Sequence, residues 1–201
     1  MKVNPHYSTQ ETLQFTYDCA KRLLLLPGVF VECGVASGSQ IGAMQECLQD
    51  NETERIIYGF DSFQGIPFAG ENDAEQPGIG KKDESKHGLL ESSGISSHSK
   101  EVVFSNFKRW GLKTDNLILV EGWFENTVPN YPMPDIALLR LDGDLYSSTK
   151  VCMEYFFPKL IKGGILIIDD YLLSGCQKAI HEFISPDEII NIFGIAYYEH
   201  L

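Results

Sequence analysis

The segment VFVECGVASG, residues 29–38, predicts a short buried strand that runs into a glycine turn. Residues 39–48 continue with the apolar spacing of a helix. A strand that passes through a glycine turn into a helix is the repeating unit of parallel α/β sheets. This one segment therefore places the chain among the α/β folds.

The same alternation continues on both sides of this segment. A helix is predicted before it at 12–26, and strands are predicted after it at 55–60, 117–121, 135–141 and 164–168. Further helices are predicted at 100–110, 148–160 and 175–183, and residues 188–199 alternate around Gly194 as an antiparallel hairpin would. We therefore expect a doubly wound, mostly parallel seven-stranded sheet with a C-terminal antiparallel hairpin.

Composition and charge exclude several classes of protein. The 201 residues fit a single domain spanning 1–201, and 43% of them are hydrophobic, as in a globular protein. The net charge of −12 disfavours binding to nucleic acid or to anionic membranes. Five cysteines without a C-x-x-C pair, no signal peptide and no apolar run of membrane length predict a cytoplasmic protein.

Residues 68–98 interrupt the pattern. The stretch is rich in Gly, Ser, Asp, Glu and Lys and has almost no apolar periodicity. Long irregular loops inside compact domains are usually lids or disordered segments. Because this stretch follows the strand that ends before Asp61, we expect a lid over a ligand site at that sheet edge. An insertion without a role is the alternative.

The glycine turn carries the first candidate site, formed by Glu32, Gly34, Val35, Gly38 and Ser39. Glycines there let the backbone approach a ligand, and helix amides can bind it. The spacing G-x-x-x-G differs from the G-x-G-x-x-G of pyrophosphate loops, and an acidic residue before it would repel a phosphate. An acidic residue at this place suits the cationic amino-acid end of S-adenosylmethionine. An ordinary tight turn is the alternative.

Two further strand ends suggest the rest of a nucleoside site. Asp61 and Ser62 follow the second strand, where an acidic residue accepts hydrogen bonds from ribose hydroxyls. Gly122 and Trp123, followed by Phe124, come after the third strand and are candidates for packing against adenine. Turn formation at Asp61-Ser62 and plain core packing at Trp123 are the alternatives.

Aspartates follow the next two strands. The motif LLRLDGD ends in Asp142 and Asp144, and IIDDY contains Asp169 and Asp170. Neighbouring parallel strands lie about 4.8 Å apart, so Asp142, Asp169 and Asp170 should converge at one sheet edge. Such carboxylates stay ionised together only with a cation, and oxygen ligands favour Mg²⁺, then Mn²⁺ or Ca²⁺. Helix capping is the alternative.

Together these motifs resemble the macrocin-type (TylF-like) O-methyltransferases, a class I family with a Rossmann-like fold. The resemblance is carried, in order, by FVECGVASGS, YGFDSFQGIP, NLILVEGWFENTVP, LLRLDGDLYSST, GGILIIDDY and GCQKAIHEF. It implies an S-adenosylmethionine-dependent methyltransferase that uses Mg²⁺ and methylates a hydroxyl of a small molecule, such as a sugar of a natural product. The terminal hairpin also suits this class better than the dinucleotide-binding Rossmann domain.

The resemblance also implies roles for individual residues. Methionine-moiety binding falls on Glu32, Gly34, Gly38 and Ser39, ribose binding on Asp61 and Ser62, and metal binding on Asp142, Asp169 and Asp170. The resemblance also implies that Asp142 is the general base. Two other functions stay open, a non-catalytic nucleoside-binding module and a catechol-type O-methyltransferase. A homo-oligomer is also open, with the leucines at 23–26 as candidate interface residues.

Overall fold

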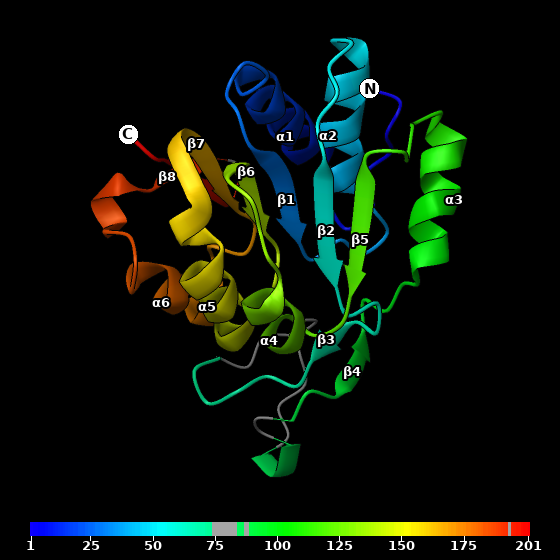
Figure 1. Ribbon diagram of the computed structural model, residues 1–201. Helices are drawn as coiled ribbons and strands as arrows, with labels where there is room; N and C mark the ends of the chain where they lie inside the picture. The colour runs from blue at the N-terminus through cyan, green and yellow to red at the C-terminus, as the bar shows by residue number, and fades with distance from the viewer. Residues whose placement is uncertain (74–83, 87–88, 193) are drawn as a thin grey trace.

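The computed structural model describes residues 1–73, 84–86, 89–192 and 194–201. Its main sheet consists of β1 (Val29–Cys33), β2 (Ile57–Asp61), β5 (Leu117–Glu121), β6 (Ile136–Leu141), β7 (Leu160–Ile168), β8 (Ile190–Ile192) and β9 (Ile195–Glu199). The strand order is β5-β2-β1-β6-β7-β9-β8 (Figure 1). The first five strands in this order run parallel, and β9 is antiparallel to both of its neighbours. The predicted sheet and its antiparallel hairpin are confirmed.

Helices cover both faces of this sheet. They are α1 (Gln10–Arg22), α2 (Ser39–Asp50), α3 (Lys100–Trp110), α4 (Phe124–Thr127), α5 (Tyr146–Tyr155) and α6 (Ser174–His181). One buried cluster joins the sheet to α1, α2 and α3, and a second joins it to α5 and α6. Phe30 and Val31, adjacent on β1, enter opposite clusters, as the period of two of a strand requires. The result is a three-layered α/β domain.

Helix α1 ends four residues earlier than the apolar spacing predicts. Arg55, which precedes β2, donates hydrogen bonds to the carbonyl oxygens of Leu23, Leu24 and Leu26 at 2.6–3.1 Å. Its guanidinium thus binds carbonyls after the last helical turn, in place of further helical amides. Leu23 is buried and Leu25 is fully exposed, so residues 23–26 form a turn rather than one apolar helix face.

The boundary between α5 and β7 also differs from the prediction. The helix ends at Tyr155, a 3-10 turn follows at Phe157–Lys159, and β7 begins at Leu160. Pro158 lies inside this turn and has no N–H to donate to a helix, and it also disfavours helical geometry at the residue before it. The strand is therefore longer, and the helix shorter, than predicted.

Part of the stretch 68–98 is regular. β3 (Ile66–Pro67) pairs with β4 (Ser92–Ile95) as a small antiparallel sheet beyond the carboxyl ends of the central strands (Figure 1). The Ser93 hydroxyl donates to the Ile66 carbonyl at 2.7 Å, a side-chain contact that apolar periodicity does not reveal. Residues 74–83 and 87–88 of the predicted lid lie outside the described residues.

None of the helices in the described ranges has the length and apolarity that crossing a membrane requires.

Candidate active site

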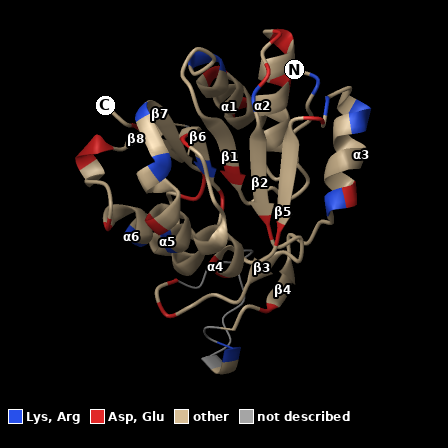
Figure 2. Ribbon diagram, viewed as in Figure 1, with Lys and Arg blue, Asp and Glu red and all other residues tan. Residues whose placement is uncertain are grey.

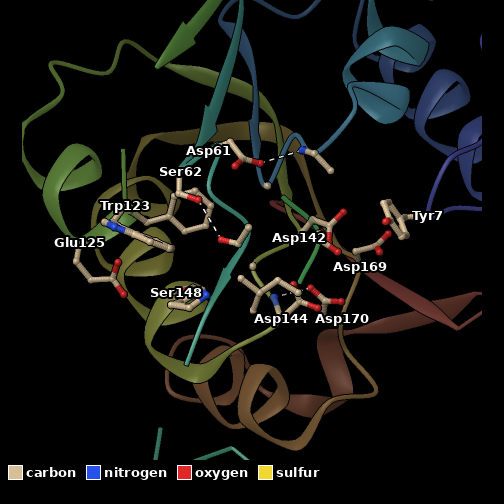
Figure 3. Close-up of a pocket in the computed structure, with 18 residues that line it drawn as sticks. Tyr7, Asp61, Ser62, Trp123, Glu125, Asp142, Asp144, Ser148, Asp169 and Asp170 are labelled. Atoms are coloured by element: carbon tan, nitrogen blue, oxygen red, sulfur yellow. Dashed lines mark hydrogen bonds between the residues drawn. The ribbon is translucent and has the colours of Figure 1, made fainter. Parts of the chain in front are cut away.

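A cavity of about 260 Å³ opens at the carboxyl ends of β1, β2, β6 and β7 (Figure 3). Acidic residues end β2 and β5 at this edge of the sheet (Figure 2). Seven candidate residues line the cavity, namely Gly34, Asp61, Ser62, Trp123, Asp142, Asp169 and Asp170. Five candidates lie outside its lining, namely Glu32, Val35, Gly38, Ser39 and Gly122. Residues from distant parts of the chain therefore meet here, but not all of those expected.

The turn after β1 packs tightly against β6. Gly34 has a φ of +97°, and a Cβ there would lie 1.8 Å from the carbonyl oxygen of Asp142. Only glycine fits this approach. Ala36 also lines the cavity, whereas the Ser39 hydroxyl donates to the carbonyl oxygen of Asn4 at 3.2 Å. The Ser39 side chain is therefore already hydrogen-bonded to the N-terminal segment.

Asp61 ties two loops together at the cavity wall. Its Oδ2 accepts hydrogen bonds from the amides of Val35 at 2.8 Å and Ala36 at 2.9 Å, and its Oδ1 accepts from the amide of Phe63 at 2.7 Å. Burial raises the pKa of Asp61, and these amides oppose the shift. The hydroxyl of Ser62 donates to the carbonyl of Gly65 at 3.0 Å and so shapes the next turn.

Aromatic and acidic side chains form the side of the cavity opposite the aspartates (Figure 3). Trp123, Phe124 and Glu125 line it at the start of α4. Burial raises the pKa of Glu125. The amide of Gly122 donates to the carbonyl of Asp61 at 2.9 Å, so this glycine positions the loop without facing the cavity. This wall offers a flat apolar surface next to a hydrogen-bond acceptor.

Four aspartates gather at the ends of β6 and β7 (Figure 3). Asp142, Asp144 and Asp170 each place a ligand oxygen within 4.8 Å of the others. The amide of Asp144 donates to Oδ2 of Asp170 at 2.8 Å, and Asp144 has a φ of +58°. The expected convergence of Asp142 and Asp170 is thus present, with Asp144 as the third member of the tight group. Asp169 lines the same cavity but turns toward Arg140.

The crowding of these carboxylates shifts their protonation. Burial, followed by the charge of Asp169, raises the pKa of Asp142 to about 7. The same two causes raise the pKa of Asp144 to about 6, and burial raises that of Asp170 well above its usual value. Like charges at this distance favour proton uptake unless a cation is present. The group therefore has the chemistry of a site for a hard divalent cation.

Arg140 and Glu32 lie behind the four aspartates, away from the cavity. Nη1 of Arg140 donates to Oε1 of Glu32 and to Oδ2 of Asp142, both at 2.8 Å, and Nη2 donates to Oδ1 of Asp169. Glu32 and Arg140 are each 1% exposed. Burial raises the pKa of Glu32 to about 8, although Arg140 opposes the shift. Direct contact between Glu32 and a ligand would require this pair to open.

Among the residues at the site that were not expected from the sequence, Asp144, Arg140 and Tyr7 matter most for its chemistry. Asp144 is two residues after Asp142 in the same motif, and this spacing could have revealed it. Arg140 stands inside an apolar strand, where a charged residue is itself a signal. Tyr7 lines the cavity from the N-terminal segment, which no sequence pattern places there.

The sheet order, the antiparallel last strands and the cavity at the carboxyl edge define a class I methyltransferase fold. The O-methyltransferase NovP superposes with a TM-score of 0.79 and 31% identity over 94% of this chain and 79% of its own. The calicheamicin methyltransferase CalS11 gives 0.77 and 26%, over 94% and 78%. The chain belongs to the macrocin-O-methyltransferase (TylF) family, whose model matches residues 11–194.

Curated relatives agree with this assignment. An 8-demethyl-8-(2,3-dimethoxy-alpha-L-rhamnosyl)-tetracenomycin-C 4'-O-methyltransferase of Streptomyces olivaceus is 36% identical over 79% of this chain and 58% of its own length. The demethyldecarbamoylnovobiocin O-methyltransferase of Streptomyces niveus is 34% identical over 83% and 63%. The mycinamicin III 3''-O-methyltransferase of Micromonospora griseorubida is 33% identical over 83% and 66%. The match to this chain thus spans less than two thirds of each relative.

Proposed function

We propose that this chain transfers the methyl group of S-adenosylmethionine to a hydroxyl of a small molecule, with a divalent cation at the acceptor. One observation carries the proposal. A single cavity, in a chain of this family, brings together a glycine turn, a ribose-type aspartate, an aromatic wall and four aspartates. Each half of a two-substrate reaction thus has residues of the required chemistry.

The cofactor half consists of the turn after β1 and the ends of β2 and β5. S-adenosylmethionine supplies an electrophilic methyl group on a sulfonium. Gly34 and Ala36 would face its methionine portion, Asp61 and Ser62 its ribose, and Trp123 its adenine. A carboxylate offers about four lone-pair sites, so Asp61 can accept from ribose while it holds three amides. The placement of Trp123 and the aspartates on opposite sides of the cavity supports this orientation.

The cation half consists of the aspartates. The oxygen donors and close spacing of Asp142, Asp144 and Asp170, and the raised pKa of Asp142, fit a hard cation such as Mg²⁺ or Mn²⁺. Asp142 and Asp170 would hold it, with Asp169, which lines the same cavity, as the third ligand that the family resemblance implies. When bound, such a cation lowers the pKa of a hydroxyl that it contacts.

Asp144 is the better proton acceptor in this arrangement. The family resemblance implies Asp142 as the general base, but its Oδ2 already accepts from Arg140 at 2.8 Å. Within the part of the chain that the structure describes, no hydrogen-bond donor reaches the carboxylate of Asp144, which lines the same cavity. We therefore assign proton removal to Asp144, and orientation of the acceptor to the neighbouring aspartates.

The acceptor we propose is a sugar hydroxyl of a natural product. The printed name of one relative specifies a rhamnosyl group, and CalS11 is described as a TDP-rhamnose 3'-O-methyltransferase at 25% identity. Vicinal hydroxyls of a deoxysugar would meet both the cation and Asp144. A catechol presents similar oxygens and is the competing acceptor.

Calorimetry with S-adenosylhomocysteine, followed by transfer of a labelled methyl group, tests the function. Rhamnosides and catechols serve as parallel acceptors, each with Mg²⁺ and after EDTA treatment. We expect product with rhamnosides, its loss after EDTA, and loss of most turnover in Asp144→Asn with unchanged S-adenosylhomocysteine binding. Binding without turnover on any acceptor would favour a non-catalytic module, and full activity in EDTA would exclude the cation.

A further inference from the structure

A single buried guanidinium lies behind the acidic wall of the cavity. Arg140 is the fifth of the six residues of β6, paired in register with Glu32 of β1 on one side and Ile167 of β7 on the other. Its side chain is 1% exposed. Removing an arginine from water is costly unless its charge and its donors are matched. Three carboxylates match it here.

Two of these carboxylates span the distance from the guanidinium to the cavity. Asp142 and Asp169 come from the ends of neighbouring strands, and both line the cavity. Their side chains are 31% and 22% exposed, whereas the third partner, Glu32, is 1% exposed. Each aspartate is therefore hydrogen-bonded to Arg140 and also partly accessible to a ligand in the cavity. Glu32 holds Arg140 from the side away from the cavity.

The Arg140–Glu32 ion pair is not arranged for stability alone. Nε of Arg140 and Oε2 of Glu32 are buried without a hydrogen-bond partner in the described residues. Unpaired buried polar atoms destabilise a fold, and such exceptions concentrate at functional sites. The two terminal nitrogens of Arg140, Nη1 and Nη2, donate to Glu32, Asp142 and Asp169.

We infer that Arg140 is a positioning residue for the cation site. Its two terminal nitrogens each hold one oxygen of an aspartate, Asp142 through Nη1 and Asp169 through Nη2, so that both carboxylates are oriented before a cation arrives. Glu32 acts through Arg140 and does not contact the cofactor. This role rests on the proposed function, because it requires that the aspartates bind a cation.

Lysine in place of Arg140 separates charge from geometry. Arg140→Lys keeps the positive charge but replaces the planar fork with a single nitrogen, which cannot hold the same set of carboxylates in fixed directions. Replacing a residue that orients a metal ligand typically weakens metal binding about 10- to 100-fold. We expect Mn²⁺ titration of the protein alone, followed by electron paramagnetic resonance, to show a loss of this size. Binding of S-adenosylhomocysteine should change less than about twofold.

Arg55→Lys is the matched control. Arg55 is partly buried and donates to four backbone carbonyls, but it lies before β2, at the opposite edge of the sheet from the cavity. Its replacement should lower stability and leave Mn²⁺ binding unchanged. If both variants weaken Mn²⁺ binding equally, the effect is general destabilisation and the positioning role is wrong.

Nuclear magnetic resonance of the arginine side chains tests the wild-type protein directly, in case Arg140→Lys does not fold. The chain has four arginines, Arg22, Arg55, Arg109 and Arg140. Hydrogen bonds on both terminal nitrogens should slow rotation of the Arg140 guanidinium and give separate signals, which should shift when Mg²⁺ is added. A single averaged signal that does not shift when Mg²⁺ is added would overturn the positioning role.

The outcomes distinguish this role from the proposed function. If wild-type protein binds S-adenosylhomocysteine but no Mn²⁺, the cation half of the proposed function fails and the role of Arg140 fails with it. If wild-type and Arg140→Lys bind Mn²⁺ equally, only the role of Arg140 fails. If Arg140→Lys loses S-adenosylhomocysteine binding and keeps Mn²⁺, Glu32 and Arg140 serve the cofactor instead.

Discussion

Asp61→Ala should both destabilise the protein and weaken cofactor binding. The carboxylate accepts three amide hydrogen bonds of 2.7–2.9 Å, two from the turn after β1 and one from the turn after β2. Alanine offers no acceptor to any of them. The loops that carry Ala36 and Phe63 would lose the group that joins them at the cavity wall.

The size of the effect follows from these three bonds. A hydrogen bond to a charged group contributes about 1.5 kcal/mol at the lower end of its range, so three give roughly 4.5 kcal/mol. Two effects reduce this sum: the carboxylate of Asp61 is itself desolvated, which raises its pKa, and water from the cavity can reach the amide of Ala36, which lines it. We expect a loss of about 3 kcal/mol in the free energy of unfolding, which lowers Tm by roughly 6–12 °C in a domain of this length.

Urea denaturation followed by circular dichroism measures the loss, and calorimetry with S-adenosylhomocysteine measures binding. Affinity should fall by about 1–3 kcal/mol, the range for a lost charge-assisted hydrogen bond. Asp61→Asn keeps one acceptor and should lose about half as much stability. Asp18→Ala is the control, because Asp18 is exposed and, among the described residues, bonded only to Gln14 on the same helix. A stability loss below about 1 kcal/mol in Asp61→Ala would refute this reasoning.

Two further predictions concern the segment between β2 and α3. Asp73 accepts from the amide of Tyr146 at 2.8 Å, at the start of α5, and from the amide of Gly70 at 2.9 Å. Asp73→Ala should therefore cost about 1–2 kcal/mol in urea denaturation, as for a lost helix cap, and a value equal to that of Asp18→Ala would contradict this. If the segment is a lid, amide hydrogen exchange within β4 should slow when S-adenosylhomocysteine and Mg²⁺ are added, because Ile66 and Ser96 line the cavity beside it. Unchanged exchange would argue for an insertion without that role.

Some elements could be predicted from the sequence to the residue. The helix Lys100–Trp110 and the strand Leu117–Glu121 have the predicted bounds. Their apolar spacing, and for α3 the glycine that follows it, are local properties of the chain. The predicted end of α1 was wrong because the turn at 23–26 is stabilised by Arg55, about thirty residues further along the chain, which binds its free carbonyls.

The candidate site divides in the same way. Alternation of strands and helices was enough to bring the ends of β1, β2, β6 and β7 to one edge, and with them Gly34, Asp61, Asp142 and Asp170. The position of Glu32 beside the turn did not show where its carboxylate points. That depends on the pairing of β1 with β6, which places Arg140 opposite it.

Local patterns in the chain were sufficient to predict the fold, the acidic edge of the sheet and the residue types available there, because periodicity and turn chemistry act within a few residues. The packing of the strands showed which aspartates share a cavity with Tyr7, that Arg140 holds two of them, Asp142 and Asp169, and that Glu32 lies behind these aspartates. These relations join strands that are far apart in the chain. Their geometry is set by register and by the matching of buried charges, which no local pattern encodes.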